Sequence, residues 1–333
     1  MEKIKVGVIG VGHLGSLHAK MFSTIESVKL DGIYDADIER AKKVAGEFKT
    51  NACNSVDELL KKVDAVSIAT PTSAHHEVAL EALNAGKHIF IEKPITKNAE
   101  QAGDLIRKAR EKNLKIQVGH IERFNPALLS IDRMKLQPLF IESHRLAQFN
   151  PRGTDVAVIH DLMIHDIDII LSLVKSKVIS IAANGVAVVT NNIDIANARI
   201  QFESGCVANV TASRISASKM RKMRLFQRDA YISLNFLEGT TEVFKLIDAN
   251  DNTTPSTMML GMVEAANKKI IYDKPARKEV NALKYELELF IDCILNDKEP
   301  EVTAEDGKRA LEVAHEIIKK IEEQNLIFAN KIQ

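Results

Sequence analysis

The first third of the chain alternates short runs of β-branched residues with longer segments in which apolar residues recur at helical spacing. Strands are predicted for the runs IKVGVIG from Ile4, VKLDGIYD from Val28, AVSIAT from Ala65, HIFIEK from His88 and KIQVGH from Lys115. Helices are predicted between them, over residues 36–48, 56–61, 75–85 and 99–112. Strands that are apolar on both faces and separated by helices are typical of a parallel, doubly wound sheet. The pattern therefore predicts an α/β domain over residues 1–122.

Beyond residue 122 the pattern changes to one helix followed by closely spaced strands. The helix is predicted over residues 156–174, and the strands over 178–189, 196–202, 206–213, 223–227, 231–236 and 241–246. A polar segment, 248–259, is predicted as a loop, and two helices, 281–295 and 304–324, follow. Sequential strands with short connections are typical of an antiparallel sheet. Residues 123–333 are therefore predicted as an α+β domain with a mostly antiparallel open sheet, whose last helices are candidates to pack back on the first domain.

The composition is that of a globular protein without a dominant charged surface. Apolar residues make up 45% of the 333 residues, and 45 Lys plus Arg balance 45 Asp plus Glu. A formal net charge of zero argues against a nucleic-acid-binding function. No apolar run approaches the ~20 residues that a membrane span needs, and the first residues lack the features of a signal peptide. Three widely separated cysteines encode neither a disulfide framework nor a CxxC metal site. We therefore expect a cytoplasmic protein with no membrane partner.

A complete GxGxxG motif, Gly10-Val11-Gly12-His13-Leu14-Gly15, follows the first predicted strand and precedes a helix. In such a loop the glycines allow a tight turn, close approach of a pyrophosphate and close helix packing, and the helix N-terminus offers N–H groups to phosphates. Asp35 ends the next predicted strand. A carboxylate at that spacing can bind the adenosine ribose and would repel a 2′-phosphate, so NAD is favoured over NADP. The alternative for Asp35 is a helix N-cap.

Two further groups of residues carry candidate chemistry. Glu92-Lys93-Pro94 lies at the carboxyl end of a predicted parallel strand, where ligands bind in open α/β sheets. A lysine there can bind a substrate hydroxyl and take its proton. Asp161, His165 and Asp168 are spaced to project from one face of a helix, where histidine can act as a general base oriented by a carboxylate. The alternatives are a surface lysine, a polar helix surface, or a metal site. Hydride transfer requires no metal, and we expect none.

Three strings taken together resemble one family of enzymes. ATPTSAHHEVALEALNAGKHIFIEKPIT, VGHIERFNP and DLMIHDID look like the glucose–fructose oxidoreductase, inositol dehydrogenase and MocA (Gfo/Idh/MocA) family, and the resemblance covers essentially the whole chain. It implies an N-terminal Rossmann domain that binds NAD and a dehydrogenase reaction at a CH–OH group. It also implies catalytic roles for Lys93, Asp161 and His165 and a cis bond before Pro94. The family often has glycine where this chain has Met163.

The resemblance extends the set of expected cofactor contacts. His75 corresponds to a histidine that the family often carries near the nicotinamide, and Thr70 and Pro71 end a strand beside the cofactor cleft. The predicted cofactor-binding residues are Gly10, Gly12, His13, Leu14, Gly15, Asp35, Thr70, Pro71, His75, Glu92 and Lys93. Arg123 and Asn125 fall at the predicted domain junction, where they are either substrate contacts or structural caps.

Within the family, strings such as RFNPALLSIDRM and TASRISASKMRKMRLFQ look closest to the bacterial UDP-N-acetylglucosamine 3-dehydrogenases, which make a 3-keto sugar nucleotide for an aminotransferase in lipid A assembly. A UDP-sugar needs cations for its diphosphate, and Arg145, Arg152, Arg214 and Arg221 are candidates. The predicted reaction is oxidation at the C3 hydroxyl, with Lys93 or His165 as the base. The predicted substrate-binding residues are Lys93, Arg123, Asn125, Arg145, Arg152, His165 and Arg214.

Two other functions stay open at this point. One is a different sugar or inositol dehydrogenase of the same family. The other is a non-catalytic NAD-binding sensor, since a fold does not dictate a function. The presence of Lys93, Asp161 and His165 together favours an enzyme, because a sensor needs none of them. The family and the expected open sheet face also predict a homo-oligomer, a dimer or a tetramer.

Overall fold

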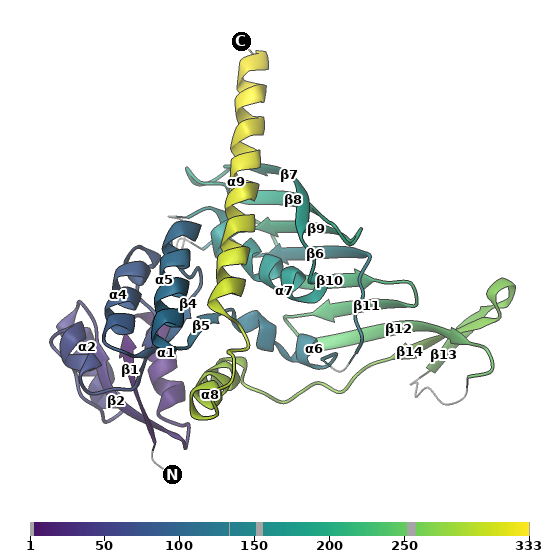
Figure 1. The fold of residues 1–333 in the computed structure, drawn as a ribbon. Coiled ribbons are helices and arrows are strands. Elements are labelled where there is room, and N and C mark those ends of the chain that lie inside the picture. Colours follow the sequence, from purple (N-terminus) through teal and green to yellow (C-terminus); the bar gives the residue numbers. More distant parts are fainter. Residues whose placement is uncertain (1–2, 133, 151–155, 252–257, 333) are drawn as a thin grey trace. The chain divides into compact units, whose positions relative to one another are not determined.

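The computed structural model describes residues 3–132, 134–150, 156–251 and 258–332, and Figure 1 labels their helices and strands. The chain divides into two compact units. Unit 1 comprises Met1–Phe124 and Val280–Glu312, and unit 2 comprises Asn125–Glu279 and Val313–Gln333. The segment predicted as a second domain, residues 123–333, is therefore shared between the two units.

Unit 1 is built on five parallel strands in the order β2-β1-β3-β4-β5. The strands are β1 (Ile4–Ile9), β2 (Val28–Tyr34), β3 (Ala65–Ile68), β4 (His88–Glu92) and β5 (Ile116–Gly119). This arrangement confirms the predicted parallel sheet. The chain continues from β1 to β2 on one side and then to β3 on the other side of β1. The carboxyl ends of β1 and β3 thus form the switch point at which open α/β sheets bind ligands.

Helices cover both faces of this sheet, which explains why its central strands β1, β3 and β4 are mostly apolar and buried. The helical elements of unit 1 are α1 (His13–Phe22), α2 (Ile38–Glu47), α3 (Val56–Leu60), α4 (Thr72–Asn84), α5 (Ala99–Lys112), the 3-10 helix η1 (Ile121–Phe124), α8 (Ala282–Leu295) and the start of α9 (Ala304–Ile332). Leu83 of α4 and Leu105 of α5 belong to one buried cluster. Phe22 of α1 and Phe290 of α8 belong to the other.

Unit 2 contains a nine-stranded sheet in the order β13-β14-β12-β11-β10-β6-β9-β8-β7. Neighbouring strands are antiparallel except β6 and β9, which are parallel, so the prediction of a mostly antiparallel sheet is confirmed. The strands are β6 (Phe140–Leu146), β7 (Val178–Val186), β8 (Ile195–Phe202), β9 (Val207–Ser213), β10 (Met220–Phe226), β11 (Ala230–Asn235), β12 (Thr240–Asp248), β13 (Met258–Val263) and β14 (Lys268–Asp273).

Strand β6 was not among the predicted strands, and its inward-facing residues explain why. Ile141, Ser143 and Arg145 are the buried positions of the strand, and two of these three are polar. A strand is recognised in a sequence by apolar residues at every second position. Strand β6 therefore lacks this signal, although it pairs with β10 on one side and β9 on the other.

Short helices and α7 cover one face of the unit 2 sheet. They are α6 (Pro126–Leu129), the π-helical turn η2 (Ile159–Met163), α7 (Ile164–Val174) and the later part of α9. The 3-10 helix η3 (Glu264–Ala266) instead connects β13 to β14. The helix predicted over residues 156–174 thus begins with a π turn, in which the residues advance by a smaller angle than in an α-helix. Asp168 is buried, whereas Asp161 and His165 are partly exposed. The predicted common face of the three residues therefore includes one buried position, that of Asp168.

The opposite face of the same sheet carries a row of aromatic rings that crosses five neighbouring strands. The row consists of Phe140, Phe226, Tyr231, Phe244 and Tyr272, and adjacent rings have centroids 4.9–5.8 Å apart. Phe140 follows the alternation of β6 and therefore points away from the face that buries its neighbour Ile141. All five rings are partly buried. The same face also carries polar pairs, such as Arg224 with Glu142 and Tyr272 with Glu242.

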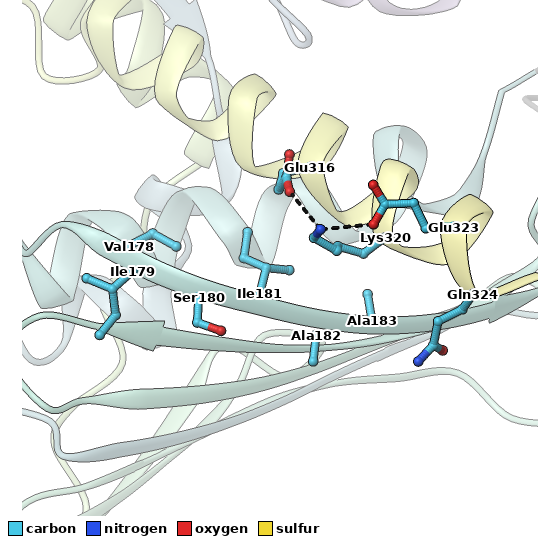
Figure 2. Close-up of a pocket in the computed structure, with 10 residues that line it drawn as sticks. All are labelled: Val178, Ile179, Ser180, Ile181, Ala182, Ala183, Glu316, Lys320, Glu323 and Gln324. Atoms are coloured by element: carbon cyan, nitrogen blue, oxygen red, sulfur yellow. Dashed lines mark hydrogen bonds and ion pairs between the residues drawn. The ribbon is translucent and has the colours of Figure 1, made fainter. Parts of the chain in front are cut away.

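A groove runs between edge strand β7 and α9 within unit 2, as Figure 2 shows. Residues 178–183 form its strand side, and Lys320 on the helix side lies 3.5 Å from Glu316 and 2.9 Å from Glu323. None of the predicted site residues lines this groove. The predicted chemistry therefore lies elsewhere in the described parts of the two units.

Candidate active site

The glycine loop between β1 and α1 has the conformation that its sequence predicts. Gly10 has φ of +83°, and a Cβ there would lie 2.8 Å from the backbone nitrogen of Thr70. A Cβ at Gly15 would collide with the carbonyl oxygen of Gly10, whereas a Cβ at Gly12 would meet no atom within 4 Å. Gly10 and Gly15 are thus required by backbone conformation and packing. Gly12 leaves open space beside the N-terminus of α1, where a phosphate group could approach.

A cavity of about 710 Å³ opens beside this loop at the switch point of the sheet. Its lining includes most of the predicted cofactor contacts: Gly10, Gly12, His13, Leu14, Asp35, Thr70 and Pro71. The buried hydroxyl of Thr70 has no hydrogen-bond partner among the described residues. A buried hydroxyl without a partner is costly, so this group is suited to bind a molecule in the cavity.

Asp35 connects the cavity to the glycine loop. Its carboxylate accepts hydrogen bonds from the N–H of Val11 at 2.7 Å and of Asp37 at 2.9 Å, and Arg40 lies 3.2 Å away. The N-cap of α2 is Asp37, which accepts from the N–H of Arg40, so Asp35 is not the cap that was its alternative. Arg40 also lines the cavity and was missed in the sequence. Its place in the first turn of the helix after Asp35 is the signal that could have found it.

The turn that carries Lys93 is held next to this cavity by His75. The Lys93–Pro94 peptide is cis, as the family resemblance implied. The Nδ1 of His75 lies 2.9 Å from the carbonyl oxygen of Pro94, and its Nε2 lies 2.9 Å from that of Thr70. Burial lowers the pKa of His75, although both carbonyl oxygens oppose this change. His75 is buried and does not line the cavity, so its direct contact with a cofactor stays a prediction.

The candidate residues of unit 2 lie at the start of its main helix. Asp161 belongs to the π turn and His165 to the first turn of α7, and both are partly exposed. The backbone N–H of Asp161 donates to the carbonyl oxygen of Ala157 at 3.2 Å. The ring of neighbouring His160 packs edge-on against His315 of α9, with centroids 5.0 Å apart. A π turn inside a helix is often found at functional sites, which fits the predicted role of Asp161 and His165.

Two of the arginines predicted to bind a diphosphate have partners inside unit 2. Arg145 is 2% exposed and donates from Nε and an Nη to the two carboxylate oxygens of Asp166, both at 2.9 Å. Arg214 is 4% exposed, donates to the carbonyl oxygen of Val156, and lies 3.7 Å from Asp194. These placements weigh against the predicted diphosphate contacts, because each guanidinium lies in the protein interior. Arg152 lies outside the described residues.

The residues at the junction of the two units also have structural partners. Asn125 caps α6 by accepting from the N–H of Ala127 at 3.1 Å, and its Nδ2 donates to the carbonyl oxygen of Phe236. Arg123 lies in η1, and its guanidinium is 3.8 Å from the carboxylate of Asp306 in unit 1. The structure thus gives Asn125 the capping role that was the alternative to substrate binding. The substrate contacts of both residues stay predictions.

The described residues contain no group of three or more His, Cys, Asp or Glu that could hold a metal ion. Within the same ranges, no helix combines the length and apolar character needed to cross a membrane. All three cysteines are buried free thiols, and burial raises the pKa of Cys206 to about 11 and that of Cys293 to about 12. They are therefore unreactive core residues rather than part of a site.

Comparison with known proteins supplies the context for this geometry. Residues 4–120 match the model of an oxidoreductase family with an NAD-binding Rossmann fold, and residues 138–233 match the Gfo/Idh/MocA C-terminal domain. A UDP-N-acetylglucosamine 3-dehydrogenase from Acidithiobacillus ferrooxidans is 44% identical over 245 residues, which cover 73% of this chain and 78% of that protein. The chain belongs to the Gfo/Idh/MocA oxidoreductase family. It is accordingly an NAD-dependent oxidoreductase that acts on a CH–OH group.

Two further similarities define its place among members of the family. The solved structure of the Acidithiobacillus ferrooxidans enzyme matches this chain with a TM-score of 0.88 and 38% identity, over 97% of this chain and 99% of that one. A scyllo-inositol 2-dehydrogenase (NAD(+)) from Bacillus subtilis is 28% identical and covers 94% of this chain and 92% of its own length. The glycine loop, the open space at Gly12, the carboxylate of Asp35 and the hydroxyl of Thr70 all fit NAD in the cavity of unit 1.

Proposed function

We propose that this oxidoreductase converts UDP-N-acetylglucosamine to its 3-keto derivative with NAD as the oxidant. The observation that supports this substrate is the similarity to an enzyme of that name, which extends over nearly the full length of both chains at 38% identity. The inositol dehydrogenase from Bacillus subtilis is 28% identical over 94% of this chain. Lys93, Asp161 and His165 are all present, as the reaction requires under this proposal.

The reaction removes a hydride from C3 of the sugar and a proton from the oxygen at C3, and both electrons leave with the hydride. NAD, when bound, accepts the hydride at C4 of the nicotinamide. Lys93 or His165 takes the proton from the hydroxyl, and Asp161 holds the histidine or the reacting hydroxyl. The turn of Lys93 lies next to the cofactor cavity, and the ring nitrogens of His75 are each 2.9 Å from a carbonyl oxygen, of Pro94 and of Thr70. This link supports Lys93 as the group nearest to the hydride transfer.

The diphosphate of the substrate requires cationic side chains. Among the four arginines considered, Arg145 and Arg214 are buried against Asp166 and Asp194. Arg221 on β10 is exposed. We therefore assign the diphosphate contact to Arg221 and Arg152 in preference to the two buried arginines.

The same proposal includes a cytoplasmic homo-oligomer whose product is consumed by an aminotransferase in lipid A assembly. The row of partly buried aromatic rings on the unit 2 sheet supports self-association, because aromatic residues are enriched at protein interfaces. Three buried free thiols are compatible with a reducing compartment. Light scattering of the purified chain would show whether it is a monomer, a dimer or a tetramer.

The direct test is NADH formation with NAD and a panel of UDP-sugars, free hexoses and inositols. A carbonyl trap or a coupled aminotransferase belongs in the assay, because formation of the ketone is expected to lie uphill. Turnover with UDP-N-acetylglucosamine alone would support the proposal. Turnover with a free sugar or an inositol would show that UDP-N-acetylglucosamine is not the substrate, and the assignment as a dehydrogenase would stand. Binding of NAD without turnover on any compound would favour a sensor.

A further inference from the structure

A buried histidine, His18, lies between the pyrophosphate-binding helix and the lysine turn of unit 1. It belongs to α1, which starts at His13 directly after the glycine loop, and its side chain is fully buried. Its Nδ1 lies 2.7 Å from the hydroxyl of Ser67 on β3, and its Nε2 lies 3.0 Å from the Glu92 carboxylate at the end of β4. Helix α1 and strands β3 and β4 therefore meet at one imidazole ring.

The direction of these contacts follows from the groups involved. The Nε2 of His18 and the Glu92 carboxylate form a close polar contact at 3.0 Å, although its angles fall outside hydrogen-bond geometry. An ionised carboxylate has no proton to donate, so this contact is favourable when Nε2 carries the proton. With the proton on Nε2, Nδ1 can accept the hydroxyl proton of Ser67. The two polar partners thus favour one tautomer of the ring. Packing alone would require neither contact, although the ring also meets Phe90 edge-on at 5.4 Å.

The Glu92 side chain lies beneath the turn that carries Lys93. Its carboxylate accepts the backbone N–H of Lys93 at 3.3 Å. A Cβ at Gly119 on the adjacent strand would lie 3.0 Å from a carboxylate oxygen of Glu92, so the glycine provides the room that this carboxylate needs. The side chain of Glu92 is only 14% exposed. Its position is therefore determined from three sides, by Gly119, by the turn and by His18.

The groups around Glu92 favour the ionised form of its carboxylate. Burial on its own would raise the pKa of Glu92, but the neighbouring His18 and Lys93 outweigh burial and lower it. Glu92 is consequently a carboxylate at neutral pH, held directly beside the lysine to which the reaction is assigned. Loss of the His18 donor would raise the pKa of Glu92 and remove a negative charge near Lys93 as the pH falls.

We propose that His18 is a positioning residue for Lys93, which holds the Glu92 carboxylate in place beneath the lysine turn and couples that turn to the pyrophosphate-binding helix. The inference rests on the proposed catalytic role of Lys93. His18 touches neither substrate nor cofactor in this proposal. It acts through Glu92, and Ser67 fixes the orientation of its ring.

Two substitutions at position 18 separate this role from simple packing. The amide nitrogen of Gln can reach the position of the histidine Nε2 and can still donate to Glu92. The shorter Asn reaches only the position of Nδ1, so it retains the contact with Ser67 and loses the contact with Glu92. We expect His18→Asn to lower kcat by about tenfold to a hundredfold, because a displaced catalytic group loses rate of this order. His18→Gln should recover most of the rate, and both should keep the NAD affinity of the wild type.

The pH dependence of kcat distinguishes this role from a purely structural role of His18, which would leave it unchanged. In His18→Asn the acidic limb of kcat should shift to higher pH, because Glu92 without its donor takes up a proton more readily. In His18→Gln the limb should return toward the wild-type position. Equal profiles for the Asn and Gln variants would overturn the proposal. Where thermal unfolding shows that His18→Asn is not folded, Glu92→Gln replaces it, and a wild-type pH profile in that variant would likewise overturn it.

A second readout does not depend on the substrate. An amine-reactive reagent, with peptide mapping by mass spectrometry, reports the rate at which Lys93 is modified as a function of pH, and exposed Lys97 serves as the internal control. In His18→Asn the pH dependence of Lys93 labelling should change while that of Lys97 stays constant. If the wild type shows no turnover but this change occurs, the proposed function fails and the role of His18 stands. If labelling of Lys93 is unchanged, the role of His18 fails whatever the enzyme oxidises.

Discussion

Arg40 in unit 1 and Arg145 in unit 2 each pair with an aspartate, yet their surroundings give them opposite uses. Arg40 lies 3.2 Å from Asp35, its side chain is 47% exposed, and it lines the cofactor cavity. Arg145 is 2% exposed and donates two hydrogen bonds to the carboxylate of Asp166. The first arginine follows the carboxyl end of a parallel strand, and the second occupies an inward-facing position within a strand. Position in the element, more than residue type, therefore decides whether a charged group serves binding or stability.

The largest effect is expected at the strand end that carries Lys93. Replacing Lys93 with Ala should lower kcat by about 10²–10⁴-fold, the range that general acid–base groups contribute. Unfolding by urea and NAD affinity should stay at the wild-type level, because Lys93 follows the strand and does not line the cofactor cavity. Lys97→Ala, four residues on at an exposed position, is the matched control and should keep full turnover. Turnover of Lys93→Ala at the wild-type rate would remove the lysine from the mechanism.

The next largest effect is expected at the buried arginine of unit 2, Arg145, and concerns stability. Arg145→Ala leaves the buried carboxylate of Asp166 without its bidentate partner, which should cost about 3–5 kcal/mol of unfolding free energy. Arg224→Ala on β10 breaks an exposed pair with Glu142 and should cost about 1 kcal/mol or less. Urea unfolding measures both. A stable Arg145→Ala protein with weakened substrate binding would instead restore the diphosphate role predicted for this residue.

The third prediction tests whether Asp35 serves binding. Asp35→Asn removes the charge that faces the cavity and should weaken NAD binding by about tenfold to a hundredfold, as the loss of a hydrogen bond to a charged group does. The preference for NAD over NADP should fall as well, because the repulsion of a 2′-phosphate is lost. Asp31→Asn lies on the same strand before the carboxyl end and should leave both affinities unchanged. Fluorescence titration with each dinucleotide checks the result, and an unaltered NAD affinity in Asp35→Asn would contradict it.

The same comparison explains how much the sequence could predict. The glycine loop, Asp35 and the lysine turn are short-range features, in which spacing from a strand end determines position, and the fold around them follows from the alternation of strands and helices. The burial of Arg145 and Arg214 depends on which face of β6 or of the residues after β9 is covered. Which face is covered is decided by segments that pack on the sheet from elsewhere in the chain, so the local sequence pattern does not reveal it. The link from His18 to Ser67 and Glu92 joins residues 49 positions and more apart and has no local signature.

The smallest effect is expected at the amino end of β4, the strand whose carboxyl end carries Glu92. The Nδ1 of His88 accepts the N–H of Lys115 at 3.0 Å, so this nitrogen must be unprotonated. Burial, followed by the charge of Lys115, lowers the pKa of His88. The unfolded chain therefore binds the proton more readily than the folded one. The stability that the neutral ring contributes is present above the ordinary histidine pKa, near pH 6.5, and is lost as the pH falls below it.

His88→Asn keeps an acceptor at the position of Nδ1 and removes the titration. We expect the wild type to lose on the order of 1 kcal/mol or less of unfolding free energy between pH 7.5 and pH 5 through this residue, and the variant to lose correspondingly less. Urea midpoints at the two pH values measure the difference, while kcat at pH 7.5 should be the same in both proteins. An identical pH dependence would show that the Lys115 bond survives protonation. A fall in kcat at neutral pH would instead show that the amino end of β4 contributes to function. That result would contradict the assignment of function to the carboxyl end of the strand alone.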